Sequence, residues 1–310
     1  MNILILGGSG FIGINLIYRL LKENINICVY DKNIDTYLAQ LISKKRIKFI
    51  KADFIIENDF EKKLQSIDCV IDLIHTTIPT ELNEMTSFEV YSNLIPSINF
   101  FNAAVKKRIK KIIFISSGGK IYGNRKNYNS IKENAMTEPV CPYGITKLAI
   151  EKFLKIISTN TETKFIILRP SNPYGINFNS KNRQLGLINV TLNKIIMGET
   201  LNVWGDGTNY RDYIYIGDLT EAISRSITLE TKKNYLINIG TGYGIKIIDL
   251  VRLIEKITLK KIDINFLPPR TIDVNFNVLD IGKAKKILKW EPKINIEQGI
   301  KITWDWLKKI

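Results

Sequence analysis

Residues 2–13 read NILILGGSGFIG, and this stretch decides the fold. The apolar run at 2–6 is bounded by glycine, which is the pattern of a buried parallel strand. Gly7, Gly10 and Gly13 follow at G-x-x-G-x-x-G spacing, and apolar residues then recur at helical spacing. A strand, a glycine-rich turn and a helix in this order predict the first unit of a parallel α/β sheet.

Further short apolar runs predict more strands, with helical stretches between them. These runs are 25–30, 47–50, 69–74, 111–116 and 164–168. Strands that alternate with helices indicate a parallel sheet with helices on both faces. After about residue 170 the alternation breaks into Asn- and Gly-rich loops. We therefore expect a Rossmann-type doubly wound parallel sheet in residues 1–170, rejoined by 210–240, and a smaller, interleaved substrate-binding lobe in 171–310.

The composition is that of an ordinary globular protein, with 310 residues, 45% of them hydrophobic and 24% charged. Three widely spaced cysteines, at 28, 69 and 141, exclude a disulfide framework and a CxxC metal site. No apolar run reaches the roughly 18 residues of a membrane span. The first residues, MNILILGG, lack the basic segment of a signal peptide. We expect a cytoplasmic protein with no metal and no membrane partner.

The net charge of +15 raises the question of a nucleic-acid partner. The basic residues are scattered as KK and KR pairs, and no basic stripe alternates with aromatic residues, so we expect no nucleic-acid binding. Ile, Lys and Asn are all abundant, as an AT-rich genome would produce. The excess charge either reflects that bias or helps to attract an anionic substrate.

The glycine loop predicts a dinucleotide site. Glycines let the backbone approach a pyrophosphate, and the helix N-terminus offers N–H groups to it. Asp31 lies 18 residues beyond Gly13, at the end of the second predicted strand, where it can accept hydrogen bonds from an adenosine ribose. A carboxylate there would repel a 2′-phosphate, and the next residues are Lys32 and Asn33 rather than Arg. These features favour NAD over NADP.

Tyr143 and Lys147 form the candidate catalytic pair. Their spacing of four places both side chains on one face of a helix. A free tyrosine, with a pKa near 10, is a poor base at neutral pH, and a neighbouring ammonium together with a nicotinamide ring would favour the phenolate. The Y-x-x-x-K spacing is common by chance. It is informative here because it follows a predicted strand that ends in Ser116 and Ser117.

Taken together, these motifs resemble the extended short-chain dehydrogenase/reductases, in particular the NAD-dependent nucleotide-sugar epimerases and dehydratases of the UDP-glucose 4-epimerase type. The resemblance covers nearly the whole chain. It rests on GGSGFIG (7–13), KADF (51–54), SSGGKIYG (116–123), PYGITK (142–147), RPSNPYG (169–175), WGDGTNYRDYIYIGDL (204–219) and PPRTID (268–273).

The resemblance implies a role for each matching residue. Tyr143 is the implied catalytic base and acid, and Lys147 the residue that binds the nicotinamide ribose and lowers the tyrosine pKa. The other cofactor contacts that it implies are Gly7, Gly10, Phe11, Ile12, Gly13, Asp31, Asn33, Asp53, Phe54, Leu73, Asn93 and Ser116. For the substrate diphosphate and nucleotide it implies Asn172, Arg211, Arg270 and Asp273, which agrees with the bidentate fit of arginine to phosphate. Asn277 takes the position that gates the sugar pocket, and its intermediate size favours tolerance of acetamido sugars.

The chain departs from the family pattern at several positions. The family usually has Ser or Thr four residues before Tyr122, where this chain has Gly118, so we expect Ser117 to be the third catalytic residue. Gly119 and Lys120 replace the acid pair that a 4,6-dehydratase needs, which disfavours that reaction. The only histidine, His75, lies three positions from the family histidine, and we assign it no role.

These observations lead to one expected function with two alternatives. The expected reaction is 4-epimerisation of a UDP-hexose or UDP-N-acetylhexosamine through a 4-keto intermediate, for surface polysaccharide synthesis. A nucleotide-keto-sugar reductase or another epimerase of the family is the first alternative, and a non-catalytic NAD-binding sensor is the second. The resemblance also implies a homodimer formed by the helix with Tyr143 and the helix before it. The apolar stretch 95–105 fits either that interface or the core.

Overall fold

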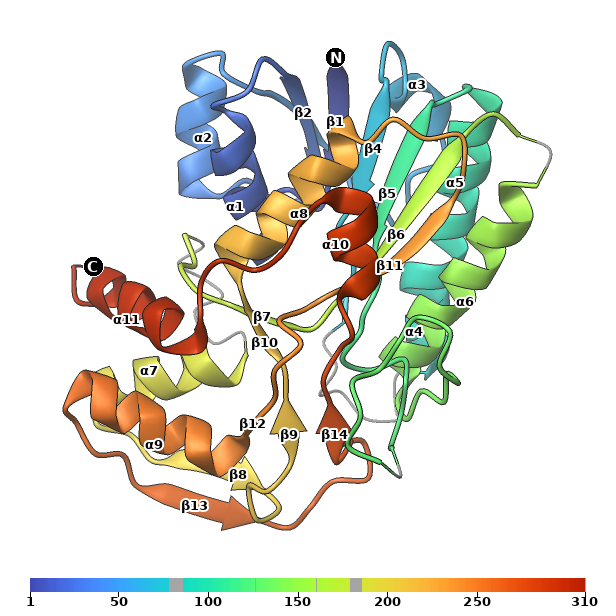
Figure 1. Ribbon diagram of the computed structural model, residues 1–310. Helices are drawn as coiled ribbons and strands as arrows, with labels where there is room; N and C mark the ends of the chain where they lie inside the picture. The colour runs from blue at the N-terminus through green and yellow to red at the C-terminus, as the bar shows by residue number, and fades with distance from the viewer. Residues whose placement is uncertain (78–85, 126, 160, 179–185, 310) are drawn as a thin grey trace.

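The structure is a computed structural model that describes residues 1–77, 86–125, 127–159, 161–178 and 186–309. Within these residues a seven-stranded sheet, with all its strands parallel, forms the centre of the molecule (Figure 1). Its strands are β1 (Asn2–Leu6), β2 (Asn26–Asp31), β3 (Lys48–Lys51), β4 (Cys69–Asp72), β5 (Lys111–Ile115), β6 (Lys164–Pro170) and β11 (Tyr235–Ile239). The predicted parallel α/β sheet is confirmed.

The strand order is β11-β6-β5-β4-β1-β2-β3, so the direction of winding reverses between β1 and β4. In open parallel sheets, ligands bind at the carboxyl ends of the strands beside such a reversal. The loops that follow β1, β4, β5 and β6 all leave from this edge. The strand order therefore places the glycine loop next to the segments that carry the other predicted site residues.

Helices cover both faces of the sheet. On one face lie α1 (Phe11–Leu20), α2 (Thr36–Ser43) and α8 (Ile216–Thr228), and on the other lie α3 (Phe60–Lys63), α5 (Ile95–Lys106) and α6 (Pro142–Ile157). Successive strand side chains point to opposite faces. Ile3 and Ile5 accordingly enter one core, and Leu4 and Leu6 enter the other. The strands read as continuous apolar runs because both of their faces are buried.

The remaining elements form a smaller region below the carboxyl edge of the sheet in Figure 1. Three helices, α7 (Leu187–Met197), α9 (Ile247–Thr258) and α11 (Ile296–Leu307), share a hydrophobic core there. Short strands pair around them: β7 (Asn172–Tyr174) with β10 (Tyr213–Tyr215), β8 (Leu201–Trp204) with β13 (Ile264–Leu267), and β9 (Tyr210–Arg211) with both β12 (Ile245–Lys246) and β14 (Phe276–Asn277). Two further short helices are α4 (Thr86–Glu89) and α10 (Gly282–Leu288), and a π-helical turn at Val90–Leu94 links α4 to α5.

The chain passes between the two regions more often than the sequence predicts. Residues 216–239 return to the sheet as α8 and β11, inside the expected segment 210–240. A second return follows at α10, where Ala284, Leu288 and Trp290 pack in the core of the sheet. The indole N–H of Trp290 donates to the carbonyl of Asp218 at 3.1 Å. The prediction assigned this segment to the substrate-binding lobe, because no strand pattern marks it.

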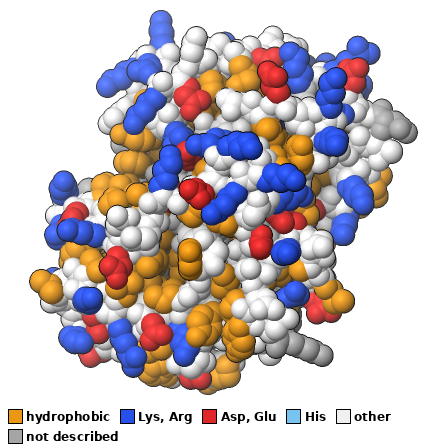
Figure 2. Space-filling view, viewed as in Figure 1, with side chains coloured by type: hydrophobic (Ala, Val, Ile, Leu, Met, Phe, Trp, Pro, Cys, Tyr) orange, Lys and Arg blue, Asp and Glu red, His pale blue; other side chains and the backbone are white. Residues whose placement is uncertain are grey.

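The apolar stretch 95–105 lies in α5, and its two phenylalanines are core residues. Phe100 and Phe101 are buried among Phe54, Phe114 and Phe165. On the face seen in Figure 2, lysine and arginine side chains are spread over both regions and alternate with acidic and uncharged ones. Among the described helices, none is long and apolar enough to cross a membrane.

Candidate active site

The glycine loop has the geometry that a dinucleotide requires. Gly7 adopts a positive φ of 75°, which glycine tolerates without strain, and its N–H donates to the carbonyl of Tyr30. A Cβ on Gly13 would lie 2.6 Å from the Cα of Gly8, so only glycine allows helix α1 to approach the loop this closely. Within the described part of the chain, no side chain caps the N-terminus of α1 at Gly10. The N–H groups there are oriented for a pyrophosphate, and the loop fits the cofactor.

Asp31 ties the glycine loop to the end of β2. Its carboxylate accepts hydrogen bonds from the backbone N–H groups of Ser9 and Asn33, both at 3.0 Å. The Ser9 hydroxyl closes the arrangement by donating to the carbonyl of Asn33 at 2.5 Å. A carboxylate held in this position, beside the loop, has further lone pairs available for a ribose.

Other predicted cofactor residues divide into side-chain and backbone positions. Asp53 accepts a hydrogen bond from the N–H of Ile55 at 3.0 Å, which fixes the turn after β3. The Phe54 ring lies in the core against Tyr30 and Phe60, so its role in holding adenine, which stays a prediction, would fall to its backbone. Phe54 is turned inward because burial of an aromatic ring is strongly favourable.

Two more of these residues bind other parts of the protein. The Ser116 hydroxyl donates to Glu151 at 2.5 Å, in a buried network behind the site, and the contact of Ser116 with the cofactor stays a prediction. Asn93 is buried, and its side-chain oxygen accepts from the N–H of Thr76 at 2.8 Å. It thereby holds the loop after β4, whose first residue, Leu73, donates its N–H to the carbonyl of Leu6.

Helix α6 presents Tyr143 and Lys147 on one face, as predicted from their spacing. The Lys147 ammonium is buried, donates to the carbonyl of Ile115 at 2.9 Å and lies 4.7 Å from the centre of the Phe114 ring. Burial lowers the pKa of Lys147 to about 8, although the carboxylates of Asp72, Glu89 and Glu151 favour its charged form. A lysine in this state still carries a positive charge at neutral pH.

The Tyr143 hydroxyl is a protonated phenol in the protein alone. Burial raises the pKa of Tyr143 to about 12, and a hydrogen bond with Ser117 acts in the opposite direction. A bound nicotinamide ring and the ammonium of Lys147 are the positive charges that would bring this pKa toward neutrality. The arrangement suits proton exchange between the phenol and a substrate hydroxyl.

After β5, the direction in which each successive residue points decides which one supplies a hydroxyl to Tyr143. Gly118 points away from the site: a Cβ there would lie 2.5 Å from Leu279 and 3.0 Å from the carbonyl oxygens of Arg169 and Pro170. On the opposite side of the chain, a Cβ on Gly119 would lie 3.5 Å from the Asn172 side-chain oxygen and 3.9 Å from Ser117 Oγ. Ser117 therefore faces Tyr143, and a side chain at 118 would not.

Cationic side chains gather on the opposite side of the site. Arg270 forms a bidentate pair with Asp273, at 2.8 and 2.9 Å, and stacks on the Trp204 ring with 4.3 Å between the guanidinium carbon and the ring centre. Arg211 donates to the carbonyl of Tyr210 at 2.9 Å, and burial lowers its pKa. Lys120, which the sequence analysis did not assign to the site, belongs to this group. Its charge interacts with those of Arg211, Arg270 and Asp273.

Asn172 and Asn277 hold the walls between these two groups. Asn172 donates from its side-chain amide to the carbonyl of Asp212 at 2.8 Å. Asn277 is 1% exposed and donates to the carbonyl of Gly118 at 2.8 Å. Its amide therefore fixes the Gly118–Gly119 segment. Its side-chain oxygen has no hydrogen-bond partner among the described residues.

Two further features of the site were missed in the sequence. His75 lies against Tyr143, with 4.4 Å between the ring centres. A buried ion pair between Glu151 and Arg169, with contacts at 2.9 and 2.5 Å, supports the floor of the site and extends to the Tyr122 hydroxyl. A lone histidine after an apolar strand carries no periodic signal, and the ion pair joins residues from two separate elements.

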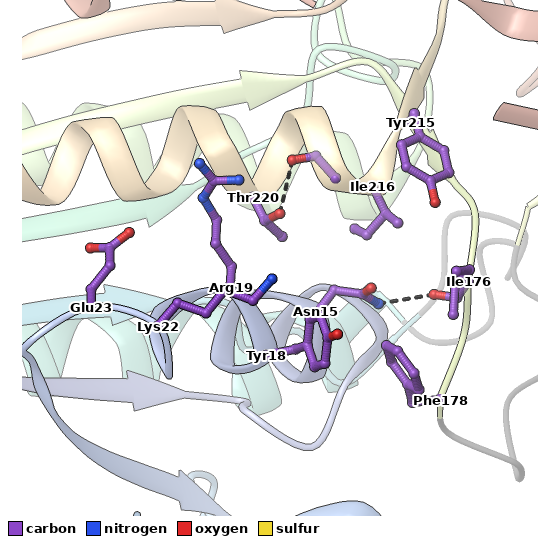
Figure 3. Close-up of a pocket in the computed structure, with 11 residues that line it drawn as sticks. Asn15, Tyr18, Arg19, Lys22, Glu23, Ile176, Phe178, Tyr215, Ile216 and Thr220 are labelled. Atoms are coloured by element: carbon purple, nitrogen blue, oxygen red, sulfur yellow. Dashed lines mark hydrogen bonds between the residues drawn. The ribbon is translucent and has the colours of Figure 1, made fainter. Parts of the chain in front are cut away.

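A cavity of about 350 Å³ lies elsewhere, between α1 and α8 (Figure 3). Its polar groups are largely engaged within the protein: the Asn15 amide donates to the carbonyl of Ile176 at 3.0 Å, and the Thr220 hydroxyl to that of Gly217 at 3.0 Å. None of its lining residues belongs to the predicted site. The candidate catalytic groups are those at the carboxyl edge of the sheet.

Comparison with known proteins agrees with this geometry. The chain is 31% identical over 309 residues to a putative UDP-glucose 4-epimerase of Methanocaldococcus jannaschii, covering 99% of this chain and 98% of the relative. It is 32% identical to a dTDP-4-dehydro-6-deoxyglucose reductase of Escherichia coli, covering 96% and 95%. The crystal structure of UDP-glucose 4-epimerase with UDP-glucose from Thermotoga maritima has a TM-score of 0.91 at 29% identity, covering 100% and 99%.

The sequence model of the NAD dependent epimerase/dehydratase family matches residues 3–240. The resemblance predicted from the motifs is thereby confirmed, as are the assignment as an enzyme and the use of NAD. The chain belongs to the NAD dependent epimerase/dehydratase family and is an NAD-dependent enzyme of the UDP-sugar epimerase type.

Proposed function

We propose that this enzyme epimerises C4 of a UDP-hexose or UDP-N-acetylhexosamine. The observation that supports this most directly is the grouping of Tyr143, Lys147 and Ser117 beside the glycine loop, at the carboxyl edge of the sheet. These are the groups needed to move a proton on and off a secondary hydroxyl. The putative epimerase of M. jannaschii, aligned over nearly the full length of both chains, supports the same reaction.

In the proposed mechanism each residue has one task. NAD, which the glycine loop and Asp31 would hold, would supply a hydride acceptor when bound. Ser117 holds the sugar 4-hydroxyl. Tyr143 takes the hydroxyl proton as the phenolate, holds it as the phenol while the sugar is oxidised, and then gives it back. The Lys147 charge favours the phenolate that starts the cycle and re-forms at its end. Since the reaction has no net redox change, the cofactor stays bound through the cycle.

The sugar must turn within the site so that the hydride returns to the other face of the 4-keto intermediate. We assign Arg211, Arg270, Asp273 and Asn172 to the diphosphate and nucleotide, which stay fixed while the sugar moves. Gly119, whose missing side chain would lie beside Asn172 and Ser117, leaves room for this rotation. Asn277 fixes the Gly118–Gly119 segment through its bond to the Gly118 carbonyl, and so sets the space available to an acetamido group.

A nucleotide-keto-sugar reductase is the second candidate, because the E. coli relative at 32% identity is named for that reaction. A reductase consumes exchangeable NADH or NADPH, whereas an epimerase needs none. We further propose a cytoplasmic homodimer that supplies sugars for surface polysaccharide. A non-catalytic sensor would not need the Tyr143 and Lys147 pair.

The test begins with protein purified without added cofactor. The protein is denatured and the released NAD assayed, and intact protein is incubated with UDP-glucose and with UDP-GlcNAc while products are resolved by NMR. We expect bound NAD and conversion to the 4-epimer, abolished by Tyr143→Phe with NAD content unchanged. Tyr243→Phe, at an 82% exposed tyrosine, is the matched control and should retain full activity. Turnover only after addition of NADH or NADPH would establish the reductase instead.

A further inference from the structure

The single histidine of this chain lies directly against the proposed catalytic tyrosine. His75 follows β4, and its ring meets that of Tyr143 edge to face, at an interplanar angle of 74°. Its side chain is 9% exposed. A buried polar ring in contact with a catalytic group needs a structural or chemical reason for its presence.

Glu89, at the end of α4, orients the imidazole. The His75 Nε2 atom lies 2.8 Å from Glu89 Oε1, and the Glu89 side chain is 4% exposed. The oxygen lies off the ideal direction of the ring N–H, but the imidazole has no other polar partner within the described residues. The Thr77 hydroxyl donates to the second carboxylate oxygen. The Glu89 carboxylate is therefore held between Thr77 and His75, and its contact with His75 sets the direction of the imidazole ring.

The charges around the ring keep it neutral. Lys147 faces it from α6, Glu89 from α4, and Asp72 lies three residues before it at the end of β4. Burial and the Lys147 charge lower the pKa of His75 to about 4, against the opposing effect of Glu89. The neutral ring carries one proton, and the nearby Glu89 carboxylate, 2.8 Å from Nε2, favours that proton on Nε2.

We propose that His75 is a positioning residue that fixes the Tyr143 ring through edge-to-face contact, with Glu89 and Thr77 fixing the imidazole in turn. Tyr143 is in the first turn of α6, and the edge-to-face contact with His75 limits the rotation of its ring about the side-chain bonds, in addition to the hydrogen bond with Ser117. Holding it keeps the hydroxyl toward Ser117 and the substrate. The inference rests on the proposed role of Tyr143 in epimerisation. Misplacement of a reacting group by about 1 Å can reduce a rate by about a hundredfold.

The first test does not require a substrate. Because the chain has one histidine, ¹⁵N-histidine labelling gives the signals of His75 alone. We expect the Nε2–H tautomer, no titration between pH 5 and 8, and a shift of the ring proton signals in Tyr143→Leu, which removes the aromatic neighbour. A solvated imidazole titrates at about pH 6.5. If His75 titrates there and its ring signals do not shift in Tyr143→Leu, the proposal is overturned.

The second test separates positioning from folding. In His75→Ala we expect kcat to fall at least about tenfold, with KM and bound NAD within about twofold of the wild type. Glu89→Ala should lower kcat in the same way. The kcat of the double variant should be no lower than that of either single variant, because both changes release the Tyr143 ring. Glu89→Gln keeps an oxygen acceptor and should restore most of the rate. Glu199→Ala removes an exposed carboxylate and is the control.

The outcomes distinguish failure of the positioning role of His75 from failure of the proposed epimerase function. If the wild-type enzyme epimerises its substrate and His75→Ala has the same kcat, the positioning role is overturned while the proposed function stands. If no nucleotide sugar is converted, the proposed function fails. The NMR result on His75 then still decides whether the ring is neutral and held against Tyr143.

Discussion

Replacing Gly118 by serine tests which residue supplies the hydroxyl beside Tyr143. By the usual family pattern the substitution restores a missing catalytic group and should raise activity. The structure predicts the opposite, because a side chain at 118 enters the core at Leu279. The backbone cannot move aside, since the Gly118 N–H donates to the carbonyl of Pro170 at 2.8 Å and its own carbonyl accepts from Asn277 at 2.8 Å.

The cost follows from the contacts that a Cβ would make. A distance of 2.5 Å to Leu279 Cδ1 forces this fully buried side chain to shift, and the two carbonyl oxygens at 3.0 Å leave little room on the other side. Overpacking of this kind costs about 1–3 kcal/mol. At about 2 °C per kcal/mol for a chain of this size, Tm should fall by about 2–6 °C.

The assay combines calorimetry with the epimerase reaction. Gly118→Ser should lower Tm without raising kcat. The double variant with Leu279→Ala should lose less stability than the sum of the losses of the two single variants, because the shorter side chain opens the space that the serine needs. Ser117→Ala is the matched control, with unchanged Tm and a kcat reduced by about a hundredfold. A Gly118→Ser enzyme with wild-type Tm and a higher kcat would refute the assignment of Ser117.

Three further predictions concern the surroundings of the site. The rate should fall above about pH 8, because burial lowers the pKa of Lys147 to about 8 and the lysine loses its charge there. The decrease should be visible in a profile of kcat against pH. Lys147→Met, which is already slow, should not show it. Arg169→Met leaves Glu151 charged and unpaired in the core, and urea unfolding should show a loss of about 3–5 kcal/mol, largely recovered when Glu151 is also replaced by Met; equal stabilities would contradict the pairing. Asp31→Ala removes the acceptor that joins Ser9 to Asn33, so the purified protein should contain little NAD, and a full complement on denaturation would count against this role.

The sheet and the placement of Tyr143 and Lys147 on one helix face could be predicted because their signals are local. A strand buried on both faces is a continuous apolar run, and the spacing of Tyr143 and Lys147 places them together on any helix. The glycine loop is equally local, since the close approach of α1 to Gly8 admits only glycine at 13. None of these inferences needs a contact between distant segments.

The parts that could not be predicted depend on distant contacts. Whether 117 or 118 faces the site is settled by Leu279, some 161 residues further along the chain. The inward turn of Phe54 depends on aromatic partners that the sequence gives no reason to group, and the Ser116 hydroxyl is drawn away by Glu151 on α6. His75 gains a role only from its packing against Tyr143.

The return of α10 and Trp290 to the sheet has a consequence for building chimaeras with related enzymes. The region that we assign to the nucleotide sugar is not one exchangeable cassette, since α8 and β11 interrupt it first and α10 interrupts it again. A graft of residues 171–310 from a relative would import foreign packing for Ala284, Leu288 and Trp290 beneath the native sheet. A transplant of specificity that spares the sheet must exchange the intervening segments separately and retain these three side chains.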